Sequence, residues 1–475
     1  MEPTVQPPAL STNELTVTES ALRDLFWRHS CLCLSGGGFR ATLFHLGAIR
    51  RFNELGVLSR LSVITSVSGG SILNGLLACN WSRLKLDKKT GVFTNLEEMI
   101  AQPMRKFCAK DLRTPMMLGT RLNPFNWPTI ARDRLSVSAN FLAEGYEPLY
   151  YGTHLSNLPE PFERSPLFVF CATNEASGEC WQFHGGPHAR MGDPTTGYCD
   201  VGHVRVSEAV AASSAFPPGF SAFRLKIPSG TPIYETPSYV VFEGPSNNRR
   251  DSPNGLTDGS GRLPEEVLLT DGGVYDNLAL EPVWNNFPVI FVSDAGLPFQ
   301  SCDRLNQFFI SRLKRTSDIG LNQVADLRKR WLIERFKREP PDRYGTIFAL
   351  DSELNDFWEH GNVPASDRHG YGEEARDSIE KVRTDLDAFS EAEIACLENH
   401  GYAMANAALV AHFREHFPNK DSEFRWPHEH WSRDYRALQA LSKSHERGIV
   451  RDVARYLMGS LIGEANVPTS ILPRR

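Results

Sequence analysis

Hydrophobic positions along the chain alternate between short continuous runs and longer stretches at helical spacing. The run 31–34 is followed, after three glycines, by a helical pattern over 39–55. The run 61–67 is followed, after Ser68-Gly69-Gly70, by a helical pattern over about 71–79. A buried strand gives a continuous apolar run, whereas an amphipathic helix repeats its apolar positions every three to four residues. Two such strand–turn–helix units in succession predict an α/β fold with parallel strands.

Further short apolar runs, rich in β-branched and aromatic residues, predict more strands of the same sheet: 167–171, 239–242, 267–270, 289–292 and 346–349. Between 228 and 265 the chain is rich in Gly, Pro, Ser and Asn, which predicts an insertion with mobile loops. We therefore expect a central, mostly parallel sheet that is flanked by helices in a three-layer sandwich.

Helical patterns replace strands after residue 301, and they predict helices over 305–313, 321–331, 379–389, 391–412 and about 446–462. Between 304 and 343, Lys and Arg exceed Asp and Glu by six, and four aromatic residues lie in the same segment. A surface for anionic lipid would fit this composition. A helix pair that packs on the core, with its charges in solvent, is the favoured interpretation.

The domain organisation expected from these patterns has three parts. Residues 1–18 form a flexible arm, residues 19–300 form the α/β domain, and residues 301–475 form a mostly helical region packed on or beside it.

Composition excludes several classes of protein. Hydrophobic residues make up 41% and charged residues 23%, as in globular proteins, and the net charge of −6 gives no attraction to nucleic acid. No apolar run is long enough to span a bilayer, and the first residues lack the pattern of a secretory leader. Nine cysteines without a Cys-x-x-Cys pair predict reduced thiols and no zinc site. We expect a cytoplasmic protein.

The motif at 66–70 lies where a predicted strand meets a helix. A nucleophilic serine is exposed by a sharp turn, which needs small residues two positions before and after it. Gly70 meets this requirement for Ser68, and Ser66 stands where a glycine is usual. Ser66 itself lies within the strand, and Ser71 lacks the second small neighbour. Ser68 is therefore the expected nucleophile, with an ordinary glycine turn as the alternative.

Two more glycine-rich turns follow predicted strands. The sequence Ser35-Gly36-Gly37-Gly38-Phe39-Arg40 can present backbone amides to an anion at a helix start. It lacks the Lys-Ser/Thr of a phosphate-binding loop, so an oxyanion hole is the remaining interpretation. The sequence Asp271-Gly272-Gly273 places a carboxylate at the carboxyl edge of the sheet, although this motif is by itself a common turn.

In this order, the three motifs resemble those of the patatin-like phospholipase family. The segment 207–218 is similar to that family's Ala/Ser-rich helix and Phe-Pro-Pro turn. The resemblance covers about 31–294, and it implies Ser68 as nucleophile, Asp271 as its partner and the loop 36–38 as oxyanion hole, with Gly37 and Gly38 as its central donors. The family's basic residue falls on Arg40, for which we consider three roles: holding the loop, contacting a lipid phosphate, or forming a surface ion pair.

The resemblance implies a lipid acyl hydrolase of the phospholipase A type that forms an acyl-serine and needs no metal or cofactor. A free aspartate is a weak base, but its pKa rises in a water-poor site. The expected partners are a phospholipid or other acyl lipid, a membrane surface, and an activating ligand or protein that the sequence does not identify.

Two alternatives stay open. One is a Ser-His-Asp esterase or thioesterase, because eight histidines follow Asp271. The other is a lipid-binding switch protein with weak catalysis. His428 and His430 lie two apart in a loop, a spacing more often found at surfaces than in metal sites.

Overall fold

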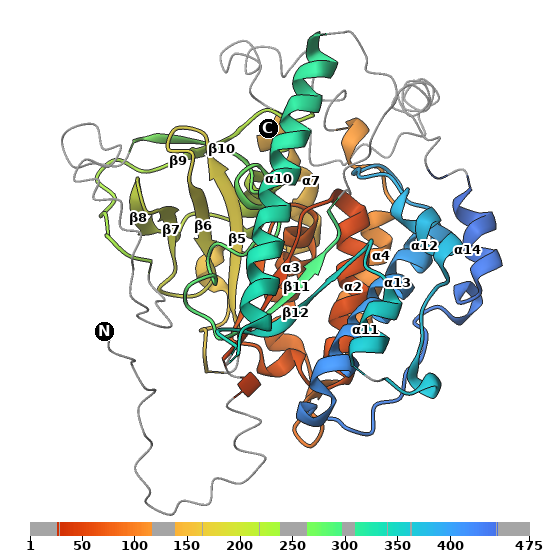
Figure 1. The fold of residues 1–475 in the computed structure, drawn as a ribbon. Helices are drawn as coiled ribbons and strands as arrows, with labels where there is room; N and C mark the ends of the chain where they lie inside the picture. Colours follow the sequence, from red (N-terminus) through yellow and green to blue (C-terminus); the bar gives the residue numbers. More distant parts are fainter. Residues whose placement is uncertain are drawn as a thin grey trace, which may run out of the picture.

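A ten-stranded mixed sheet forms the centre of the molecule (Figure 1). The computed structural model describes residues 26–444 except 28, 116–137, 164, 218, 238–263, 297–308, 340, 362 and 443. Five neighbouring strands are parallel, in the order β12 (Tyr344–Ala349), β11 (Val289–Asp294), β1 (Ser30–Leu34), β2 (Val63–Ser66) and β5 (Leu167–Asn174). The predicted α/β fold with a parallel core is confirmed.

Antiparallel strands extend this core beyond β5. They are β6 (Cys180–His184), β7 (Arg190–Asp193), β8 (Gly197–Asp200), β9 (Phe223–Lys226) and β10 (Glu266–Asp271). Of these, the sequence predicted only β10, because the others are short and several contain glycine or charged residues in place of an apolar run. A separate pair, β3 (Leu86–Asp87) and β4 (Val92–Phe93), completes the strands. The predicted strand 239–242 lies outside the described residues.

Strand β5 brings distant segments of the chain together. Its first half pairs with β2 in parallel, with Ser66 opposite Phe170. Its second half pairs with β10 in antiparallel, with Asp271 opposite Ala172. Strand β6 pairs with both halves of β5, so β2 and β10 share the other edge. The carboxyl ends of β2 and β10 therefore meet head to head, and the residues that follow them become neighbours.

Helices cover the two faces of the sheet unequally. One face packs against α2 (Gly38–Glu54), α3 (Gly69–Asn80), α8 (Val206–Ser213) and α13 (Glu391–Phe413) in the larger apolar core. The other face packs against residues 278–287 and the long α10 (Phe309–Lys337), which stands in front of the strands in Figure 1. The remaining α-helices are α4 (Gln102–Cys108), α7 (Ser138–Tyr150), α9 (Gly273–Asp276), α11 (Leu354–His360), α12 (Glu373–Glu380) and α14 (Asp434–Leu441).

The backbones of α2 and α13 are in contact. A Cβ atom at Gly47 would lie 2.0 Å from the carbonyl oxygen of Glu398, and one at Gly401 would lie 1.8 Å from that of Phe44. Arg105 donates hydrogen bonds of 2.6 and 2.7 Å to the buried Glu398 carboxylate. Together with β12, α13 makes the C-terminal part of the chain a component of the same layers.

Two sequence predictions in the C-terminal region are wrong. The expected helices 305–313 and 321–331 are one continuous helix from residue 309, because Gly320 alone does not break the helix. The expected helix 379–389 is absent, since α12 ends at Glu380 and the backbone then turns to pack against Gly38. The helix 446–462 and the boundaries at 18/19 and 300/301 lie outside the described residues. In the described ranges no helix is long and apolar enough to cross a membrane.

Candidate active site

Ser68 occupies the sharp turn between β2 and α3. Its backbone dihedrals, φ 51° and ψ −117°, are rare for a residue with a side chain and indicate local strain. The two following glycines permit close approach of backbone. A Cβ at Gly69 would lie 2.1 Å from the carbonyl oxygen of Gly38, and one at Gly70 would lie 2.5 Å from that of Leu34. The turn thus presents Ser68 directly beside the glycine loop that follows β1.

The neighbouring serines form a buried hydrogen-bond network under this turn. The Ser71 hydroxyl contacts those of Ser66 at 3.0 Å and Ser213 at 2.8 Å, and Ser66 donates to the carbonyl of Val169. Ser213 also accepts a hydrogen bond of 3.0 Å from the Ser68 amide. Ser66 and Ser71 are fully buried. The network gives both rival serines a structural role, and it explains why a serine stands at 66.

Asp271 ends β10 and lies beside Ser68 with 2% of its surface exposed. Its carboxylate accepts a 2.7 Å hydrogen bond from the Gly273 amide, and the Ser68 side chain lies beside it. Burial raises the pKa of Asp271 to about 7, and the Gly273 amide and the Ser68 side chain oppose the rise. A carboxyl with this pKa can act as a base near neutral pH.

The three backbone amides of the glycine loop differ in their hydrogen bonding. Gly36 donates to the carbonyl of Asn277 at 3.1 Å, so this amide is occupied. Within the described chain, the amides of Gly37 and Gly38 have no hydrogen-bond acceptor, and they lie at the N-terminus of α2. Both have positive φ, of 144° and 58°. A Cβ at Gly38 would lie 2.6 Å from the carbonyl oxygen of Asp385. The two amides are therefore the ones that can bind a developing oxyanion.

Arg40 is fully buried on the first turn of α2. Its guanidinium donates to the carbonyls of Ala295 at 2.9 Å, Val382 at 3.1 Å and Glu380 at 3.4 Å. Burial lowers the pKa of Arg40 to about 10. Of the three roles considered, this geometry fits holding the loop. A buried guanidinium on backbone carbonyls is neither a surface ion pair nor open to a lipid phosphate.

Sequence reasoning assigned no role to several residues of this site. Asn277 lies between two glycine turns: its Oδ1 would be 2.3 Å from a Cβ at Gly36 and 2.6 Å from one at Gly273. Its place four residues after the Asp271-Gly272-Gly273 turn is the one sequence signal for it. Asp385 comes from the C-terminal region, and no sequence signal connects it with the glycine loop.

In the described part of the chain, no histidine is hydrogen-bonded to Ser68 or Asp271. His45 is buried between Ser35 and Ser293, and burial lowers its pKa to about 4. His428 bonds the Glu398 carboxylate at 2.8 Å, and the ring of His430 contacts a guanidinium. Among the described residues, no three His, Cys, Asp or Glu side chains are grouped as a metal site would require.

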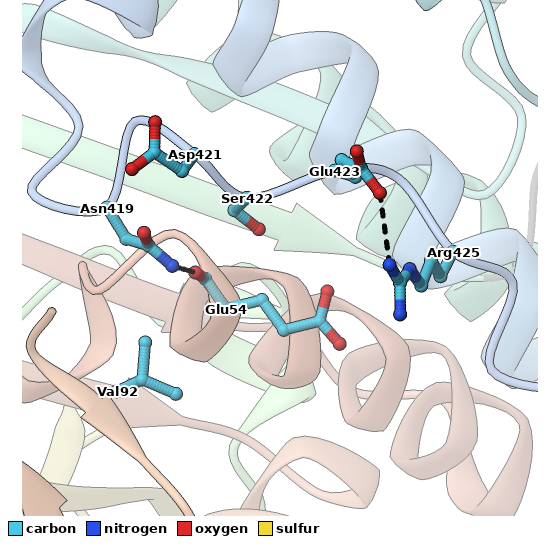
Figure 2. Close-up of a pocket in the computed structure, with 7 residues that line it drawn as sticks. All are labelled: Glu54, Val92, Asn419, Asp421, Ser422, Glu423 and Arg425. Atoms are coloured by element: carbon cyan, nitrogen blue, oxygen red, sulfur yellow. Dashed lines mark hydrogen bonds and ion pairs between the residues drawn. The ribbon is translucent and has the colours of Figure 1, made fainter.

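An open cavity of about 460 Å³ lies at the C-terminal end of α2, and Figure 2 shows its lining. Three carboxylates dominate the lining, and its one guanidinium is ion-paired to Glu423 at 3.1 Å. The excess negative charge of this lining disfavours binding of a phosphate group. Ser68 and Asp271 lie near the other end of α2 and do not line the cavity, which is formed by Glu54, Val92, Asn419, Asp421, Ser422, Glu423 and Arg425.

Comparisons with solved structures find similar chains at low identity. Human GIVD cytosolic phospholipase A2 is 14% identical, with a TM-score of 0.39, over 90% of this chain and 64% of that chain. The same enzyme in complex with methyl γ-linolenyl fluorophosphonate is 15% identical, with a TM-score of 0.36, over 88% and 59%. VipD from Legionella pneumophila is 12% identical, with a TM-score of 0.30, over 92% and 77%. This chain thus spans less than two thirds of the human enzyme.

Comparison with curated protein sequences finds no match. The model of the patatin-like phospholipase family matches residues 32–284. This match covers more than half of the chain and includes the glycine loop, the serine turn and the Asp271 turn. The protein therefore belongs to the patatin-like phospholipase family.

Proposed function

We propose that this protein hydrolyses carboxylic esters of phospholipids or related acyl lipids, with Ser68 as nucleophile and Asp271 as general base. The observation that carries the proposal is the position of the Ser68 side chain, at a strained turn, beside a buried carboxyl whose pKa burial raises to about 7. Family membership supports the lipid substrate. A lipid substrate also implies contact with a membrane surface, and regulation by an activating ligand or partner stays a prediction.

The reaction follows from these groups in two halves. The Ser68 hydroxyl oxygen attacks the acyl carbonyl carbon while Asp271 accepts the hydroxyl proton, and the Gly37 and Gly38 amides bind the carbonyl oxygen as it gains charge. Asp271 then gives the proton to the departing alcohol of the lysolipid, which leaves an acyl-serine. Water attacks the acyl-serine, Asp271 takes its proton and returns it to Ser68, and the fatty acid leaves.

The decisive experiment compares Ser68→Ala, Asp271→Asn and the double variant on phospholipid vesicles and on a soluble p-nitrophenyl ester. Each single change should remove activity by about 10³-fold or more, and the double variant should lose little further, because the two groups share one proton. Asp377→Asn and Ser378→Ala, in α12, are matched controls and should retain activity. Additive losses would contradict the shared-proton mechanism. Chelators should leave hydrolysis unchanged.

A fluorophosphonate probe separates the alternatives. Wild type should form one covalent adduct per chain, located at Ser68 by mass spectrometry, and Asp271→Asn should form it much more slowly. A variant of a late histidine that abolished activity would favour a Ser-His-Asp enzyme. Vesicle binding without any adduct or turnover would identify a lipid-binding protein.

A further inference from the structure

Helix α10 is exposed to solvent over most of its length. Leu332 is the one buried residue among the side chains described in this helix. The helix is fixed to the body near its C-terminal third: Arg328 binds Glu281 at 2.9 Å, and Lys329 forms an ion pair with Asp294. Before this anchor, the described side chains of the helix are half-buried or exposed.

The anchor places the N-terminal part of α10 beside the sheet edge that carries Ser68. Asp294 ends β11 at the edge that carries Ser68, whereas Tyr344, shortly after the helix, starts β12 at the opposite edge. The helix therefore runs antiparallel to the strands. Residues 309–327 span about 28 Å of helix. Figure 1 shows the N-terminal end of α10 rising beyond the strands.

An apolar stripe follows this helix, made of Leu313, Val324, Leu327 and Trp331. These side chains are between 40% and 58% exposed. At 3.6 residues per turn, their spacing places all four within a sector of roughly 60°. Single exposed apolar residues are common, but an aligned set of large ones marks an interaction surface.

Charge identifies the kind of partner. The helix carries eight basic and three acidic residues, a net charge of +5 in a chain whose net charge is −6. Arg312 and Arg330 are exposed beside the stripe. A second copy of the same helix would bring like charges together, whereas an anionic surface would be attracted. Trp331, 58% exposed, is a side chain that favours the boundary between water and lipid.

We propose that the apolar stripe of α10 docks on the surface of an anionic lipid bilayer. The stripe enters the interface between head groups and acyl chains, and the exposed Arg312 and Arg330 contact the anionic head groups. This inference rests on the proposed lipid substrate: the docked bilayer would lie next to the sheet edge where Ser68 acts.

The test uses the full-length protein and vesicles of phosphatidylcholine, with and without phosphatidylglycerol. Wild type should sediment with the anionic vesicles and less with the neutral ones, and added salt should weaken the binding. The double variant Leu327→Gln/Trp331→Ala should bind anionic vesicles at least about tenfold more weakly. Ile333→Gln, an equally accessible apolar residue on the other side of the helix, should bind as wild type does.

Activity on the soluble ester keeps this inference separate from the proposed function. The double variant should hydrolyse the soluble ester at the wild-type rate while losing activity on vesicles. Unchanged vesicle binding by the double variant would overturn the docking role of α10, as would a wild-type dimer in analytical ultracentrifugation that the double variant dissociates. If the wild type is not labelled by the fluorophosphonate, the proposed dyad is refuted. The vesicle-binding result still tests the docking role of α10 in that case.

Discussion

In the proposed mechanism, burial of the Asp271 carboxyl sets the pH range in which hydrolysis can occur. A general base works only when deprotonated, and the pKa of this carboxyl is raised to about 7 by burial. We predict that kcat/KM on the neutral soluble ester rises with pH and levels off above about pH 8. A rate profile that is flat from about pH 5 to pH 9 would contradict Asp271 as the base.

The same carboxyl lowers the stability of the folded protein at high pH. Its folded pKa lies above the unfolded value of about 4, so the native state holds an extra proton between these values. Its contribution to stability therefore decreases as pH rises through this window. Asp271→Asn, which cannot ionise, should gain in melting temperature relative to wild type at about pH 8.5 and gain little at about pH 5. Equal gains at both pH values would refute the raised pKa.

Arg40 offers a third test at the residue scale. Arg40→Met removes three hydrogen bonds and leaves buried carbonyls without donors, which should cost roughly 2–4 kcal/mol of unfolding free energy. Because the loop itself shifts, turnover of the phospholipid and of the neutral ester should fall by the same factor. A loss confined to the phospholipid would assign Arg40 to the phosphate group instead.

At the scale of elements, the contact between α2 and α13 depends on the absence of side chains. A Cβ at Gly401 meets the backbone of Phe44, which cannot move without displacing α2. We predict that Gly401→Ala costs more than about 3 kcal/mol in urea unfolding, because overpacking here separates two helices. Gly320→Ala is the control: it meets no atom within 4 Å on exposed α10, and it should stabilise the helix slightly. Similar effects of both changes would contradict this account.

Continuous apolar runs predicted the parallel strands, because a strand buried on both faces is apolar at successive positions. Helical periodicity predicted α2, α3 and α13, because the buried positions of a helix recur every three to four residues. Strands β6 to β9 were not predicted, because they are short and lack a continuous apolar run. They are strands because they pair with neighbouring strands, which the local sequence does not show. The two helices expected over 305–313 and 321–331 are one helix, because an isolated glycine at 320 is tolerated within a helix.

Part of the candidate site was also predicted, because it too has local sequence patterns. Ser68 and Asp271 lie in turns with recognisable glycines, so their chemistry could be named from the sequence. Their mutual contact depends on β5, and the backbone groups that hold Gly38 and Arg40 come from residues 380–385. Contacts between segments so distant in the chain leave no local pattern.

At the scale of the whole molecule, the C-terminal region packs against the glycine loop 36–38. Besides β12 and α13, it supplies the carbonyl of Asp385 that accepts from the Phe39 amide at 2.9 Å. We predict that a fragment ending near residue 300 shows no cooperative unfolding and no fluorophosphonate labelling, whereas the full chain shows both. A folded, labelled fragment would demonstrate that the α/β domain is autonomous.

Because β2 and β10 meet along β5, the hydrolytic activity should depend on whether β10 stays paired with β5 and β9. Strand β10 pairs with β5 at only three positions and otherwise with the short β9. Separation of β9 and β10 from β5 would move Asp271 away from Ser68 while β12, β11, β1 and β2 stay paired. Heat or mild denaturant should therefore inactivate the enzyme before the main sheet melts, and hydrogen exchange should show β10 opening ahead of β1.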